Sequence, residues 1–343
     1  MSTEKKKKNK KNAVLYKEMT IDMKRPKIMI IMLLINIFLI PVAACFFLGI
    51  VIASITGTCS YRVLAWYLIA MVYLEAIILY MITPAITAGS VSLEKERQTL
   101  DVLLTTRMTT WEIIKGKYGS SFIFLGLMVL STFPLLALVF VFGGISFWQL
   151  LYIGLALLVF IGFVSSYGVF FSTLTKNTVL SVILTYLFVF IYTGVTISIP
   201  FILLAVVAYI NEWLYYDQIY FTINNPNFIN GDILVMSGIF SPVLTLFDVV
   251  GNTIGYDFSE FSVKGMISLC DTEAMPHFTS NNLIVKAWTP LSLVVLSLIA
   301  FINLRISAAI LNPVKGKSRN RVTNKKPGKT VKKPAEKNVT IAN

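Results

Sequence analysis

The chain has 343 residues, of which 56% are hydrophobic and only 14% are charged. This composition excludes an ordinary soluble domain, whose apolar share is about 45–50%. The net charge of +13 sits in a few segments, and this placement argues against a nucleic-acid-binding surface.

Six apolar runs follow a basic tail at residues 1–11, and each is long enough to cross a bilayer, which takes roughly 20 residues. We place the spans at Ile28–Ile55, Trp66–Ala88, Phe122–Phe142, Phe147–Thr173, Val179–Ile210 and Ala287–Ile310. The chain is therefore predicted to be an integral membrane protein.

Cationic residues gather on one side of these spans. Ten Lys/Arg lie between Lys5 and Lys27, five between Lys95 and Lys117, one at Lys176 and ten between Lys315 and Lys337. The segments on the other side hold only Arg62, Lys264 and Lys286. This is the positive-inside distribution, so we expect a multi-pass protein of the cell membrane with both termini in the cytoplasm. The basic C-terminal tail, 311–343, is expected to be disordered and to contact water or membrane lipids.

Glu75 is an acid within the second span. An unpaired charge there costs on the order of 3 kcal/mol even on the most forgiving insertion scales, so the side chain should face protein, water or a partner. Two interpretations carry equal weight. Glu75 is either a carboxylate on a translocation path or a structural residue bonded to hydroxyls of neighbouring spans.

A densely charged stretch runs from Ser90 to Gly119, between spans 2 and 3. Its leucines fall on one side of a helix and most of its polar residues on the other; the leucines are Leu93, Leu100, Leu103 and Leu104. Thr109 followed by Glu112 is a capping box that begins a second helix leading into span 3. We predict a helix, a short break and a new helix, in a place where a soluble protein can dock.

Residues 211–286, between spans 5 and 6, are the largest segment outside the spans and are predicted to be extracellular. Within them Ile233–Val250 is apolar, but a seventh span would put the basic C-terminal tail outside. Gly238, Pro242 and Asp248 also interrupt the run. A re-entrant or interfacial pair of short helices fits better.

Cys59 and Cys270 are both assigned to the outer side, which permits a disulfide. Two separate free thiols are at least as compatible with the sequence, because spacing alone does not bring the two residues within bridging distance.

The sequence shows no catalytic or metal-binding motif. Gly116-Lys117 is followed by Tyr118 rather than Ser or Thr, so it is not a phosphate-binding loop. The single His277 and the three cysteines lack the spacing of metal ligands. We therefore predict no catalytic residues, no metal site and no bound cofactor in this chain.

The charged stretch resembles the cytoplasmic coupling segment of ABC-2 type transporter permeases, the membrane subunits of ABC exporters. The family pattern is an acidic-basic-acidic-Arg cluster, Thr-Leu, two leucines, two threonines, a proline and a helix ending near Gly-Lys. The matching residues are Glu94-Lys95-Glu96-Arg97, Thr99-Leu100, Leu103-Leu104, Thr105-Thr106 and Gly116-Lys117. Arg107 stands in place of the proline, which predicts a less sharp break between the helices.

Two other regions fit the same family. Asn12–Met19 is similar to the amphipathic elbow before span 1, which we place at residues 12–27, and Val169–Tyr186 is similar to the turn between spans 4 and 5. With the six-span hydropathy, the resemblance covers almost the whole chain.

The resemblance implies an all-α integral membrane protein whose six transmembrane helices occupy residues 28–310. It further implies an N-terminal amphipathic elbow helix, a cytoplasmic coupling helix between spans 2 and 3 (segment 90–119) and a large extracellular segment between spans 5 and 6.

The implied function is that of a permease subunit of an ATP-driven exporter. It would form the translocation path, pair with a second permease subunit, identical or different, and dock separate cytosolic ATPase subunits that bind ATP and Mg²⁺. A stiff helix within Leu93–Thr106 would receive the motion of the ATPases. The implied coupling residues are Leu93, Glu94, Glu96, Arg97, Thr99, Leu100, Leu103, Leu104 and Arg107. Leu100, Leu103 and Leu104 would seat against the ATPase or the elbow, and Glu94, Glu96 and Arg97 would orient it. The alternative is a stand-alone secondary transporter or channel that uses Glu75.

Overall fold

A computed structural model describes residues 26–55, 61–105, 108–141, 145–216, 236–254 and 287–311. In these ranges every regular element is helical. The elements are α2 (Pro26–Ile55), α3 (Tyr61–Thr87), α4 (Ser92–Glu96), α5 (Leu100–Leu104), α6 (Thr110–Val141), α7 (Phe147–Leu174), α8 (Thr178–Tyr216), the 3-10 helix η2 (Gly238–Phe240), α10 (Pro242–Ile254) and α13 (Trp288–Ile310).

Six of these helices, α2, α3, α6, α7, α8 and α13, are long and apolar enough to cross a membrane. They coincide with the six predicted runs, so the all-helical, multi-pass architecture is confirmed at this level. Two helices extend beyond the predicted spans. The first begins at Pro26, within the residues assigned to the elbow, and α8 continues past Ile210 to Tyr216.

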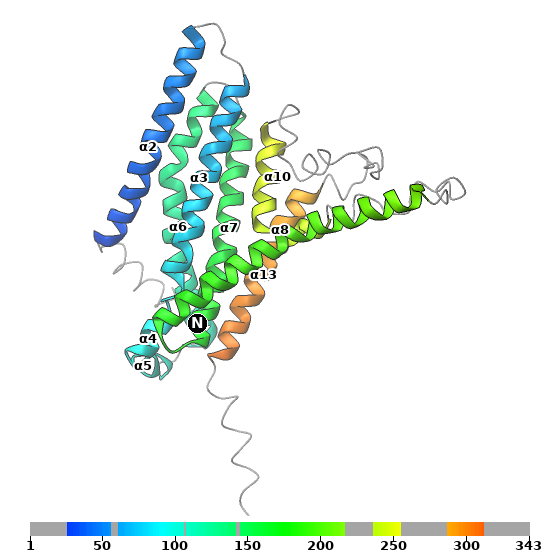
Figure 1. The fold of residues 1–343 in the computed structure, drawn as a ribbon. Coiled ribbons are helices and arrows are strands. Elements are labelled where there is room, and N and C mark those ends of the chain that lie inside the picture. The colour runs from blue at the N-terminus through cyan, green and yellow to red at the C-terminus, as the bar shows by residue number, and fades with distance from the viewer. Residues whose placement is uncertain are drawn as a thin grey trace, which may run out of the picture.

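The centre of the bundle is α7, which packs against α3, α6, α8, α10 and α13. Figure 1 shows α2, α3, α6 and α7 running side by side, with α2 at the edge. Their facing side chains form the main apolar core, in which Leu68, Leu125 and Leu157 are completely buried. A capping box between Ser146 and Gln149 begins α7.

Helix α8 starts beside α4 and then leans away from the bundle (Figure 1). Much of its apolar surface is exposed, including Ile183, Leu187 and Ile191. Within a helix the backbone N–H and C=O groups bond to one another, so mainly apolar side chains face outward here. Such a surface suits contact with lipid tails or with another apolar helix.

The predicted pair of short helices near Ile233–Val250 corresponds to η2 and α10, which meet at Ser241. Helix α10 packs against α7 and α13, and its Val249 and Val250 are completely buried. Residues 233–235 lie outside the described ranges.

The prediction of a single helix with all four leucines on one side is wrong. Instead the chain forms two short helices, α4 and α5, with a break at Arg97–Thr99. Gln98 adopts φ 57°, the left-handed region that ends a helix. The second part of the prediction is confirmed, since Thr109 and Glu112 exchange both hydrogen bonds of a capping box, at 3.2 and 2.9 Å, where α6 begins.

Several predictions fall outside the described residues. They concern the tails at 1–11 and 312–343, the elbow up to residue 25, Arg107, and the cysteines Cys59 and Cys270.

Candidate functional site

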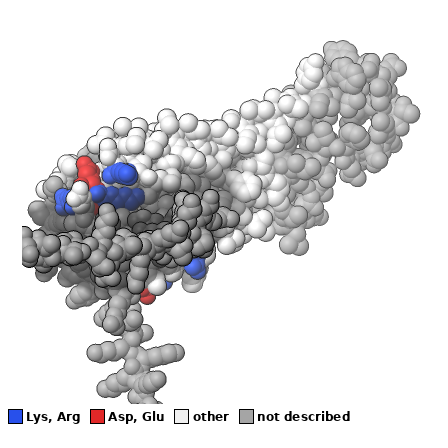
Figure 2. Space-filling model, turned by 90° about the horizontal axis from the view of Figure 1, so that it is seen from below, with Lys and Arg blue, Asp and Glu red and all other residues white. Residues whose placement is uncertain are grey.

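The segment between α3 and α6 lies at one end of the bundle, together with the start of α8 and the end of α13 (Figure 1). We call this the α4–α5 end. Figure 2 looks at it from below, where Lys, Arg, Asp and Glu side chains form a group of both signs, whereas the described residues of the part that extends away show none on this face.

A serine of α7 fixes the first turn of α4. The backbone N–H groups of Val91 and Ser92 both donate to Ser172 Oγ, each at 2.8 Å. All three residues are completely buried. Buried N–H groups need partners, so this single hydroxyl determines where α4 begins relative to α7.

The next charged residues of α4 bind the turn between α7 and α8. Lys95 Nζ donates to the backbone oxygens of Thr173 and Thr175 at the end of α7. Glu96 Oε2 accepts from the backbone N–H and the hydroxyl of Thr178, at 3.3 and 2.7 Å, at the start of α8. A cation at a helix C-terminus and an anion at an N-terminus both complement the helix dipole. The adjacent Lys95 and Glu96 therefore hold two helix ends at once.

Glu94 links α4 to α6. Its Oε1 lies 2.6 Å from Lys117 Nζ, and the Lys117 side chain is only 6% exposed against 28% for Glu94. A buried ammonium is unfavourable without a partner, so this pair ties α4 to the first part of α6.

The leucines of the segment differ in how deeply they are buried. Leu100 is buried in a cluster with Val91 and Ile114, to which α7 and α13 also contribute, and Leu103 and Leu104 pack partly against it. The sequence suggested that Leu100 seats against the ATPase or the elbow, whereas among the described residues it packs against α6, α7 and α13 of this chain. Leu93, by contrast, remains 40% exposed.

The exposed part of the segment is the outer face of α4 and the break that follows it. Arg97, Gln98 and Thr99 are exposed, next to Leu93. The break is stabilised by a hydrogen bond within the segment, in which the Thr99 N–H donates to the Glu94 carbonyl at 2.9 Å. The segment thus combines a face anchored to α6, α7 and α8 with a face open to a partner. We call the open face, Leu93 and Arg97–Thr99, the α4 face.

Glu75 is 3% exposed and accepts a hydrogen bond from Thr132 of α6. It lies among the apolar residues where α3 meets α6. Of the two interpretations left open by the sequence, this environment favours the structural one, a Glu bonded to a hydroxyl of a neighbouring span.

A second buried acid, Asp248 of α10, was not identified as a candidate from the sequence. It is 2% exposed, and its Oδ2 accepts from Thr289 Oγ1 at 2.6 Å and Asn252 Nδ2 at 2.9 Å. The sequence contained a sign of this site, because Asp248 and Asn252 are four residues apart and therefore share one face of an otherwise apolar helix. The bonds fasten α10 to the start of α13.

In comparisons with known proteins, no family model matches the chain and no curated protein matches it either.

Proposed function

We propose that this protein is the permease subunit of an ATP-driven ABC-2 type exporter. In this proposal the chain pairs with a second permease subunit, forms the path for the exported molecule and docks cytosolic ATPase subunits at the α4–α5 end. The observation that carries the proposal is the combination in α4 of internal anchoring and an open face. A helix that only linked two spans would need neither.

The anchoring supplies a way to transmit motion. Glu94, Lys95 and Glu96 connect α4 to α6, α7 and the start of α8. A push on α4 would therefore move three spans together rather than bend one loop. Binding of ATP to the partner would then bias the bundle between two arrangements through a rigid-body shift.

The α4 face is where the ATPase would bind in this proposal. Leu93 offers an apolar contact, and Arg97 offers a positive charge for a carboxylate of the partner. Glu94 and Glu96, which the sequence suggested as orienting groups for the ATPase, contribute indirectly by holding α4 in place.

The test is a purification of the tagged permease from its native membrane, with measurement of the ATPase subunit that remains bound and of its ATP hydrolysis. Leu93→Asp and Arg97→Glu should each reduce the bound ATPase about tenfold or more. Removing a leucine contact forfeits up to about 1.5–3 kcal/mol, and an acid in its place adds a desolvation penalty.

The matched control is Leu100→Ala, which removes packing inside the chain without altering the α4 face. It should lower the thermal stability of the permease but retain the ATPase in proportion to the folded protein. If wild-type permease is isolated without a stoichiometric ATPase, or if both α4-face variants keep it, the docking mechanism is wrong and a stand-alone carrier becomes the better explanation.

A further inference from the structure

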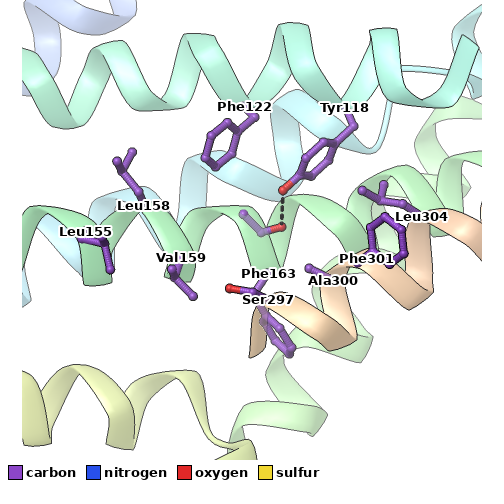
Figure 3. A pocket seen from close by; sticks show the side chains of 11 residues that line it. Tyr118, Phe122, Leu155, Leu158, Val159, Phe163, Ser297, Ala300, Phe301 and Leu304 are labelled. Carbon is purple, nitrogen blue, oxygen red and sulfur yellow. Dashed lines mark hydrogen bonds between the residues drawn. The ribbon is translucent and has the colours of Figure 1, made fainter. Parts of the chain in front are cut away.

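A pocket opens between α6, α7 and α13 (Figure 3). Its volume is about 290 Å³. From α6, Tyr118 and Phe122 stack with ring centroids 5.7 Å apart, and the Tyr118 hydroxyl donates to the Gly162 carbonyl at 3.3 Å. The absence of a side chain at Gly162 keeps the hollow open, because a Cβ there would lie 3.1 Å from the Tyr118 oxygen.

The pocket is lined almost entirely by apolar side chains. Leu155, Leu158 and Val159 of α7 and Phe301 and Leu304 of α13 form its walls. Its volume is at the small end of ligand pockets, which span roughly 300–1,000 Å³. It therefore suits a slender apolar chain better than a bulky molecule.

A cation marks the end of the pocket nearer the α4–α5 end. The Arg305 guanidinium lies 4.2 Å from the centre of the Trp111 ring and 5.0 Å from that of Phe301. Phe301 thus both lines the pocket and supports the arginine. Arg305 is exposed, and no carboxylate among the described residues forms an ion pair with it.

A second cation, Lys115, lies one turn along α6 from Trp111, the ring against which Arg305 packs. On α6 it falls on the same stripe as Trp111, Tyr118 and Phe122, since residues three and four apart share a helix face. Lys115 is exposed. Arg305 lies five residues before the end of α13 at Ile310, which is near the level where basic side chains reach lipid headgroups.

We propose that an anionic phospholipid binds here, with one acyl chain in the pocket and its phosphate between Arg305 and Lys115. The lipid belongs to the leaflet level with the α4–α5 end. Charge complementarity selects the headgroup, because the guanidinium is held by two rings and no other described residue accepts from its N–H groups, which can therefore bind a phosphate. The apolar pocket selects the chain. Since the lipid touches α6, α7 and α13 at once, it would stabilise their packing.

The experiment uses the full-length protein, delipidated in detergent and then mixed with phosphatidylglycerol or with phosphatidylcholine of the same acyl chains. Native mass spectrometry counts the lipids bound per chain. Wild-type protein should retain one phosphatidylglycerol in preference to phosphatidylcholine. Arg305→Gln and Lys115→Gln should each weaken phosphatidylglycerol binding about fivefold, and the double variant about 25-fold, because each basic residue near an anionic lipid contributes a similar increment.

Two further variants separate the headgroup from the chain. Ser297→Trp fills the pocket from an exposed position on α13 and should reduce the binding of both lipids. Lys176→Gln removes a charge from the same end of the molecule outside the pocket and should leave both unchanged.

Equal binding of the two lipids by wild-type protein, or unchanged phosphatidylglycerol binding in the double variant, would overturn the headgroup site. Unchanged binding in Ser297→Trp would overturn the placement of the chain. The assay contains no ATPase, so its result is independent of the docking proposal.

Discussion

Removing the charge of Glu94 or of Lys117 tests whether α4 is anchored as the contacts indicate. Exposed ion pairs contribute about 0.2–1 kcal/mol, whereas breaking a fully buried pair costs about 3–5 kcal/mol. This pair lies between the two limits, because Lys117 is 6% and Glu94 28% exposed. We expect Glu94→Gln to destabilise by about 2–3 kcal/mol, since it leaves the more buried charge behind, and Lys117→Met by about 1–2 kcal/mol.

The assay is thermal unfolding in detergent of the two single variants and the double variant. At this chain length a loss of 1 kcal/mol lowers Tm by roughly 2 °C. The double variant should be more stable than the sum of the single effects predicts, by about 1–2 kcal/mol, because the two changes remove one interaction. If the effects add to within about 0.5 kcal/mol, the pair does not hold α4 to α6 and the transmission of motion through it must be abandoned.

Three other predictions concern the supports of the same region and the bundle core. Ser172→Ala should lower stability by about 2–4 kcal/mol and speed amide exchange at the start of α4, because it leaves two buried N–H groups without their acceptor; exchange as slow as in the wild type would contradict this. Gly168→Ala should destabilise by about 1–3 kcal/mol, since its Cβ would lie 2.7 Å from Thr87 Cβ where α3 meets α7. Gly194→Ala is its control, because nothing lies within 4 Å of the added atom, and it should be neutral or stabilising by up to about 1 kcal/mol. Glu75→Gln can still accept a hydrogen bond from Thr132 and should keep Tm close to wild type, and a strongly altered pH dependence of transport in this variant would restore Glu75 to the translocation path.

The sequence by itself determined the helical class and the approximate positions of the six spans. A membrane leaves few choices, because every backbone group in hydrocarbon must be paired within its own helix and about 20 apolar residues are needed to cross. Local chemistry was equally readable, as the capping box at Thr109 and Glu112 shows. The segment between α3 and α6 stood out as a candidate site for the same reason, since its charges contrast with the apolar runs on both sides.

Only the tertiary structure decided what each residue of that segment touches. Periodicity assigned Leu93 and Leu100 to the same face, yet the left-handed residue Gln98 turns the chain, so Leu100 is buried and Leu93 is exposed. The sequence assigned Glu94 and Glu96 to orienting the ATPase, whereas in the structure they bind Lys117 and Thr178, 23 and 82 residues away. The pocket beside Arg305 is likewise made by three helices that are distant in sequence. Contacts of this kind depend on how helices pack and cross, and side-chain patterns along one helix do not encode which neighbour fills the facing space.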